Sequence, residues 1–124
     1  MKDNQEFKKQ LIRRAFSLAR RVVALVDDFP NKQSARVIAG QLLRAATSIG
    51  ANIIEAQAAS SKKDFINFLT HALKSGNETR FWLALAKDLN PKLISSIEEL
   101  LKETSELVKI LGSSIATLKG KNKL

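Results

Sequence analysis

Few side chains in this sequence have the chemistry of an acid, a base or a metal ligand near neutral pH. His71 is the single histidine, and the chain contains no cysteine. A zinc site needs several histidine or cysteine ligands, and a di-iron site in a helical bundle needs a Glu-x-x-His pair on each of two helices. The sequence supplies neither set. We therefore expect no metal and no cofactor, with His71 as a surface or partly buried polar residue.

Glu55 and Glu78 are the remaining candidates for acid–base chemistry, because they face each other if their segments pack antiparallel. In the alternative interpretation, Arg44, Arg80 or the amide of Asn52 pairs with these carboxylates, since an unpaired buried charge is costly. No set of nucleophile, base and oxyanion donor accompanies them, and the glycines are too scattered to form a phosphate-binding loop. We expect a structural pair and no enzymatic activity.

A narrow polar stripe runs through an otherwise apolar segment that ends near residue 59. Its members step by three or four residues, which places them in one line along a helix. A helix this apolar is normally buried in a bundle, so we expect the stripe to find its partners there. Together with Glu78 the stripe forms a predicted structural polar network of Gln41, Arg44, Ser48, Asn52 and Glu55.

Basic residues outnumber acidic ones, 21 to 12, which gives a formal net charge of +9. This excess favours a polyanionic partner. Two arginine pairs lie seven residues apart, opposite an apolar stripe through Leu11, Leu18 and Leu25, and further lysines lie near the C-terminus. We expect these residues to contact the RNA or DNA backbone without reading base sequence, the alternative being a solvated face. The predicted contact residues are Lys9, Arg13, Arg14, Arg20, Arg21, Lys119, Lys121 and Lys123.

Four helices must position these residues, because apolar residues recur every three or four positions between three breaks. The breaks are at Pro30, at residues 60–64 and at residues 90–91. Asn31 or Ser34 is the expected cap of the second helix, and Ser61 with Asp64 has the spacing of a capping box. Asn90 suits an N-cap, and the proline after it suits a first helical position.

Each predicted helix has about 26 residues and a length of about 40 Å. Matched helices and short connections predict an all-α, antiparallel up-down-up-down four-helix bundle. Residues 1–118 form the single predicted domain, and residues 119–124 form a basic flexible tail. The chain has 124 residues, no cysteine, no signal-peptide pattern and no apolar run long enough for a membrane span. We expect a cytoplasmic protein that does not contact membranes.

Phe81 and Trp82 are adjacent, so their side chains point about 100° apart on a helix. At most one of them can lie at the centre of the core. We predict that the other lies at a helix junction or a subunit contact of a homo-oligomer, where aromatic anchors are common. In the alternative, the bundle closes over both aromatic rings.

Five segments of the sequence resemble the bacterial 23S rRNA intervening-sequence family of four-helix bundles. They are QLLRAATSIGANIIE (41–55), DFINFL (64–69), ALKS (72–75), ETRFWL (78–83) and LVKILG (107–112). Ala56 and Lys74 depart from the family, which usually has glycine at both positions. The resemblance implies a homo-oligomeric, pentameric barrel of bundles whose members mostly lack a defined activity.

A related branch of that family comprises the accessory variability proteins of diversity-generating retroelements. RFWL (80–83), ILGS (110–113) and the net charge of +9 are similar to that branch. Its members are basic pentamers that bind nucleic acid and a reverse transcriptase. This similarity implies an alternative function as a protein–protein scaffold or accessory subunit for a reverse transcriptase.

Overall fold

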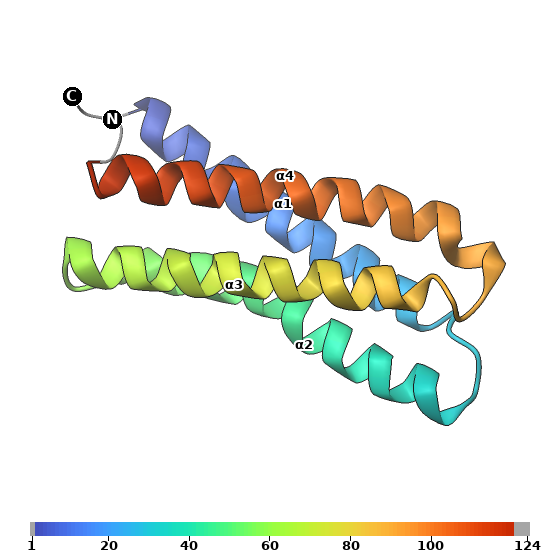
Figure 1. The fold of residues 1–124 in the computed structure, drawn as a ribbon. Helices are drawn as coiled ribbons and strands as arrows, with labels where there is room; N and C mark the ends of the chain where they lie inside the picture. The colour runs from blue at the N-terminus through green and yellow to red at the C-terminus, as the bar shows by residue number, and fades with distance from the viewer. Residues whose placement is uncertain (1, 121–124) are drawn as a thin grey trace.

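The computed structural model describes residues 2–120 and contains four long helices joined by short connections (Figure 1). The elements are α1 (Lys2–Val26), α2 (Gln33–Ala56), α3 (Lys62–Ala86), a short 3-10 helix η1 (Pro91–Leu93) and α4 (Ile94–Leu118). Each long helix packs against two neighbours, in the cyclic order α1, α2, α3, α4. Residues 2–120 contain no strand. The predicted all-α four-helix bundle is confirmed, with helices of 24 or 25 residues.

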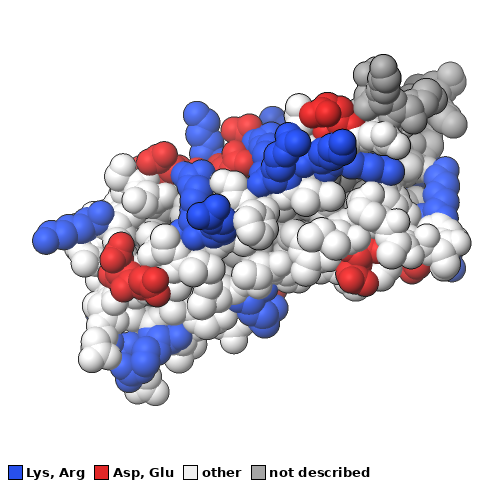
Figure 2. Space-filling view, turned by 180° about the vertical axis from the view of Figure 1, so that it is seen from behind, with Lys and Arg blue, Asp and Glu red and all other residues white. Residues whose placement is uncertain are grey.

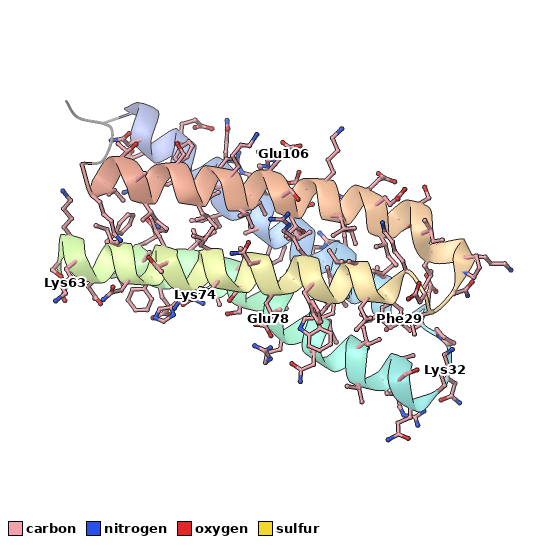
Figure 3. All side chains as sticks on the ribbon, viewed as in Figure 1. Phe29, Lys32, Lys63, Lys74, Glu78 and Glu106 are labelled. Atoms are coloured by element: carbon pink, nitrogen blue, oxygen red, sulfur yellow. The ribbon has the colours of Figure 1, made fainter. Side chains whose placement is uncertain are left out.

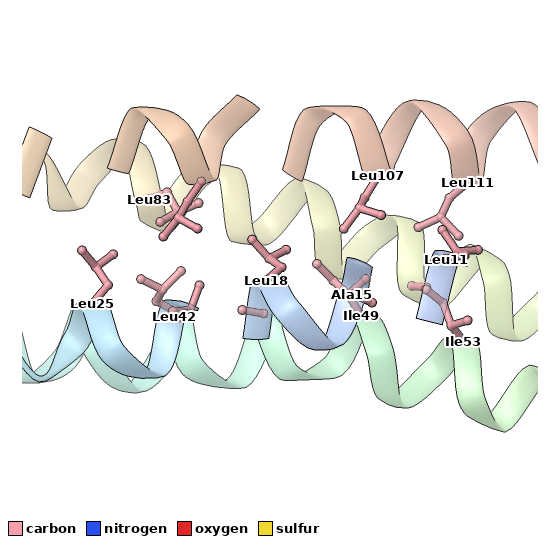
Figure 4. Close-up of a cluster of buried hydrophobic side chains, with 14 of the residues drawn as sticks. Leu11, Ala15, Leu18, Leu25, Leu42, Ile49, Ile53, Leu83, Leu107 and Leu111 are labelled. Carbon is pink, nitrogen blue, oxygen red and sulfur yellow. The ribbon is translucent and has the colours of Figure 1, made fainter. Parts of the chain in front are cut away.

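The core is built from one apolar stripe of each helix. On α1 the stripe recurs every three or four residues and is buried along its whole length; it consists of Leu11, Ala15, Leu18, Val22 and Leu25. Figure 4 shows Leu107 and Leu111 of α4 pointing inward across from Ile49 and Ile53 of α2. The two buried polar side chains in the described chain, Thr79 and Thr104, each donate a hydrogen bond to the carbonyl four residues earlier. The core therefore contains no unsatisfied hydroxyl.

The predicted helix starts are partly confirmed. Ser61 caps α3, because its Oγ accepts a hydrogen bond from the Asp64 N–H at 3.0 Å. Asn90 caps η1 through the Lys92 N–H, so the fourth helical segment begins with a 3-10 turn. The prediction for α2 is wrong, since Lys32 occupies the cap position without a side-chain cap bond. Asn31 is engaged elsewhere: its Oδ1 accepts a hydrogen bond from the Arg36 side chain.

α2 is long and apolar enough to cross a membrane by length and composition alone, a test that core helices of soluble proteins also pass. In the bundle it packs against both α1 and α3. Eight of its residues are buried there, namely Ala35, Ile38, Leu42, Ala45, Ala46, Ile49, Ile53 and Ala56. These buried residues account for part of its apolar character.

Glycine permits the closest approach between helices at one point of the bundle. A Cβ at Gly76 of α3 would lie 2.7 Å from the Cγ2 of Val108 in α4, closer than real side-chain carbons come. Gly50 of α2 lies against Ala15 of α1, at ordinary contact distance. A Cβ at Gly112 would meet nothing within 4 Å. Gly76 therefore sets the separation of α3 and α4, whereas Gly112 does not limit any packing.

We predict that Gly76→Ala lowers the free energy of unfolding by about 1 kcal/mol, because overpacking costs more than the gain in helix propensity. Gly112→Ala is the matched control and raises the free energy of unfolding by about 0.5–1 kcal/mol. Urea denaturation of both variants, at one protein concentration, measures the difference. Equal stabilisation by the two changes would show that Gly76 has no packing role.

Candidate nucleic-acid interface

The rotation of α1 places the two residues of each arginine pair on different faces. Arg14 faces α4, where its Nε and Nη2 donate to Glu103 at 2.9 Å each and its Nη2 also donates to Glu106 at 3.0 Å. The hydrogen bonds to Glu103 raise the pKa of Arg14 above its ordinary value. Two carboxylates of α4 therefore hold the Arg14 guanidinium, whose side chain is 35% exposed.

Arg21 follows Arg14 by seven residues and lies on the same face of α1. Its Nη2 is 3.7 Å from a carboxylate oxygen of Glu99, which makes a looser and more exposed ion pair. The acidic partners in α4 were not predicted. Glu99, Glu103 and Glu106 are spaced by four and three residues, which places them on one line of a helix. This spacing could have predicted the acidic line from the sequence.

Lys9, Arg13 and Arg20 lie on the opposite, solvent-facing side of α1. No carboxylate of the described residues is within ion-pair distance of any of them. Phe16 lies in the same line between the two arginines and has 62% of its surface exposed. We call Lys9, Arg13, Phe16 and Arg20 the outer stripe of α1. Sequence reasoning missed Phe16, although its spacing of three residues from Arg13 and four from Arg20 was the signal.

Figure 2 shows the face of the molecule formed by α1 and α2, with positive side chains gathered in its upper half. Negative side chains border this cluster, and a broad uncharged area lies below it. The expectation that all four arginines lie opposite the apolar stripe is therefore wrong, because each adjacent pair is split by the 100° turn of the helix. Lys119 is exposed after the last turn of α4, and Lys121 and Lys123 lie outside the described residues.

The predicted polar network lies at the surface between α2 and α3 and is not buried (Figure 3). Arg44 donates to Gln41 and to Glu78, and the Trp82 indole N–H lies 3.4 Å from the same Glu78 oxygen. The hydrogen bond from Arg44 lowers the pKa of Glu78. The network is exposed to solvent because the buried residues of α2 face away from the edge between α2 and α3.

A second, separate cluster follows along the same edge. Ser48 Oγ accepts hydrogen bonds from Ser75 and from the Asn52 amide, both at 3.0 Å. Ser75 was not predicted. The Glu55 side chain, in contrast, is exposed and has no hydrogen-bond or ion-pair partner among the described residues. The prediction that Glu55 belongs to the network is wrong. Glu55 does not face Glu78, because Arg44 lies opposite the Glu78 carboxylate.

Leu83 is fully buried, whereas Phe81 is exposed and Trp82 is partly buried and packs against the core. Their rings meet edge to face with centroids 4.9 Å apart. Phe81 has 60% of its surface exposed, so the interpretation in which the bundle closes over both rings is wrong. His71 is exposed on α3. Within residues 2–120, no group of three acidic or histidine side chains is arranged to hold a metal ion.

The lowered pKa of Glu78 makes part of the stability pH-dependent. Its ionised form is favoured in the folded state, so its contribution is present above the ordinary glutamate pKa of 4.5 and is lost as the pH falls through the lower folded-state value. We predict that Glu78→Gln reduces the loss of unfolding free energy between about pH 6 and pH 3. Glu55→Gln is the control, and an equal reduction by both changes would contradict this assignment.

Comparison with known proteins identifies the family. The family model for 23S rRNA-intervening sequence proteins matches residues 8–113. A crystal structure of a protein of unknown function from the S23 ribosomal protein family of Bacteroides thetaiotaomicron is similar, with 38% sequence identity and a TM-score of 0.79. The similarity covers 87% of this chain and 96% of that one. No curated protein sequence matches. On this evidence the chain belongs to the 23S rRNA-intervening sequence protein family.

Proposed function

We propose that the protein is a non-enzymatic, oligomeric helical bundle that binds the backbone of RNA or DNA through the outer stripe of α1. The observation that carries this proposal is the separation of the arginines into two sets. Arg14 and Arg21 face carboxylates of α4, whereas Arg13 and Arg20 have none and face water. A cation without an internal partner is available to a phosphate.

The dimensions of the outer stripe suit a strand of nucleic acid. Lys9 and Arg20 are eleven residues apart, which corresponds to about 17 Å along the helix axis. Phe16 presents an exposed ring between the two arginines, and exposed rings next to cations stack on unpaired bases. α1 buries its other face in the core, so no helix is free to enter a groove and read bases. We expect binding to depend on charge and stacking and to tolerate changes of sequence.

Fluorescence anisotropy with a labelled single strand, titrated at several salt concentrations, tests this interface. We predict that Arg13→Gln/Arg20→Gln weakens binding and reduces the log–log salt slope by about 1.4, because two phosphate contacts to the single strand are lost. The matched control is Lys92→Gln/Lys102→Gln, which removes the same charge from exposed positions away from the stripe. Equal effects of the two double variants, or no binding at low salt, would overturn the proposal.

Two uncovered apolar areas support self-association. One lies on α1 and α2 and includes Val23 and Ile54, which are 47% and 53% exposed. The other lies on α3 and includes Phe81 and Leu85, 60% and 40% exposed. Because the two areas differ and lie on different faces, contact between them in successive copies is head-to-tail and closes a ring when the rotation allows. The family resemblance implies five copies.

A mixing experiment distinguishes this arrangement from a symmetric contact. Light scattering should show Ile54→Ser alone and Phe81→Ser alone as monomers, because each lacks one side of every contact. Their equimolar mixture should form heterodimers, since each supplies the side that the other lacks. Ile94→Ser, an exposed apolar position elsewhere, should leave the oligomer intact. A mixture that stays monomeric, or single variants that keep the wild-type size, would contradict head-to-tail assembly.

The exposed Phe81 ring, which rests against the partly buried Trp82, also favours the second function that the resemblance implies, a scaffold for a reverse transcriptase. Edge-to-face aromatic rings at the surface are typical anchors of protein–protein contacts. The gene neighbourhood separates the two functions: a reverse transcriptase gene with a template repeat favours the scaffold. A location within a ribosomal RNA operon favours the nucleic-acid-binding protein alone.

A further inference from the structure

The bundle contains an apolar cavity that the proposed function does not use. It has a volume of about 610 Å³ and lies at the end of the bundle where α1 begins and α4 finishes. Figure 1 shows that the pair α1 and α4 stands apart from α2 and α3 at this end. Seven apolar side chains line the cavity, namely Phe7, Leu11, Ile53, Phe65, Leu69, Ile110 and Leu118.

The volume and the lining match those of small-molecule sites. Such sites have about 300–1,000 Å³ and walls that are mostly apolar, with a few polar groups that orient the ligand. Phe7, which the heptad-like spacing of α1 places in line with the core, remains 46% exposed here. α1 therefore does not close this end of the core, and the exposed walls of Phe7 and Phe65 are available to an apolar chain.

The polar groups of the cavity indicate the charge of its ligand. Lys8 from α1 and Lys109 from α4 line it, and no aspartate or glutamate is among the described lining residues. The Lys8 ammonium lies 5.6 Å from the centre of the Phe65 ring, which holds it at the wall. Neither lysine forms an ion pair with a described residue. Hydroxyls of Ser113 and Ser114 add hydrogen-bond donors near the end of α4.

We propose that this cavity binds a small amphipathic anion, an aliphatic chain with one carboxylate head group. The chain lies among the apolar walls, and Lys8 and Lys109 hold the carboxylate at the mouth. A neutral ligand leaves the two ammonium groups without a counter-charge, and a cationic one is repelled by them. Both lysines are outside the outer stripe of α1, so this site and the nucleic-acid interface are independent.

Isothermal titration calorimetry with decanoate, decan-1-ol and decyltrimethylammonium tests the proposal on the full chain. We expect one decanoate per chain with a Kd of about 10–100 µM, and about fourfold weaker binding for each methylene removed. Lys109→Met should weaken decanoate about tenfold and leave decan-1-ol unchanged. Lys102→Met, an exposed position on α4 outside the lining, is the control and should change neither.

Ser114→Phe fills the cavity from α4 and should abolish binding of decanoate. If that variant does not fold, the comparison of Lys109→Met with Lys102→Met decides alone. Three results would overturn the proposal: no saturation with decanoate up to about 1 mM, equal affinity for decanoate and decan-1-ol, or preferential binding of decyltrimethylammonium.

Discussion

Burial of one apolar stripe determines how α1 is rotated about its axis, and the surface chemistry of the protein depends on that rotation. Leu11, Leu18 and Leu25 point into the core, so positions three residues further along face α4. There Arg14 meets Glu103 and Glu106. The preceding residue in each pair, Arg13 or Arg20, is turned about 100° away and is exposed, with no ion-pair partner among the described residues. The same rotation thus places Arg14 and Arg21 in ion pairs with α4 and leaves the outer stripe of α1 exposed to solvent.

The two ends of the bundle differ in how completely the helices close. In the middle, Gly76 allows α3 to approach α4, and Ala15 meets Gly50 where α1 crosses α2. Away from these small residues, α1 and α4 diverge from α2 and α3 at the end that contains both chain termini. Large side chains such as Phe7 do not bridge that separation. The apolar cavity is therefore a consequence of close packing elsewhere in the same helices.

The sequence was sufficient for the architecture and for part of the local detail. Helical periodicity and the breaks at Pro30, Ser61 and Asn90 predict four helices in the right places, because these signals are local. Burial was harder to predict. The alanines and isoleucines of α2 suggested a helix covered on all sides, yet Ile54 is exposed and Arg44 lies at the surface. Composition alone does not reveal which apolar residues of a single chain remain exposed to solvent.

The same limit explains the errors in the candidate site. Adjacent arginines looked equivalent in the sequence, whereas the partners of Arg14 come from α4, about 90 residues away along the chain.

A cross-linking experiment tests most directly the division of the arginines into those paired with α4 and those of the outer stripe. A single strand containing 4-thiouridine, irradiated with the full protein and analysed by mass spectrometry, should cross-link to the α1 peptide that contains Phe16. Cross-links confined to α3 or α4, with none on α1, would contradict the account.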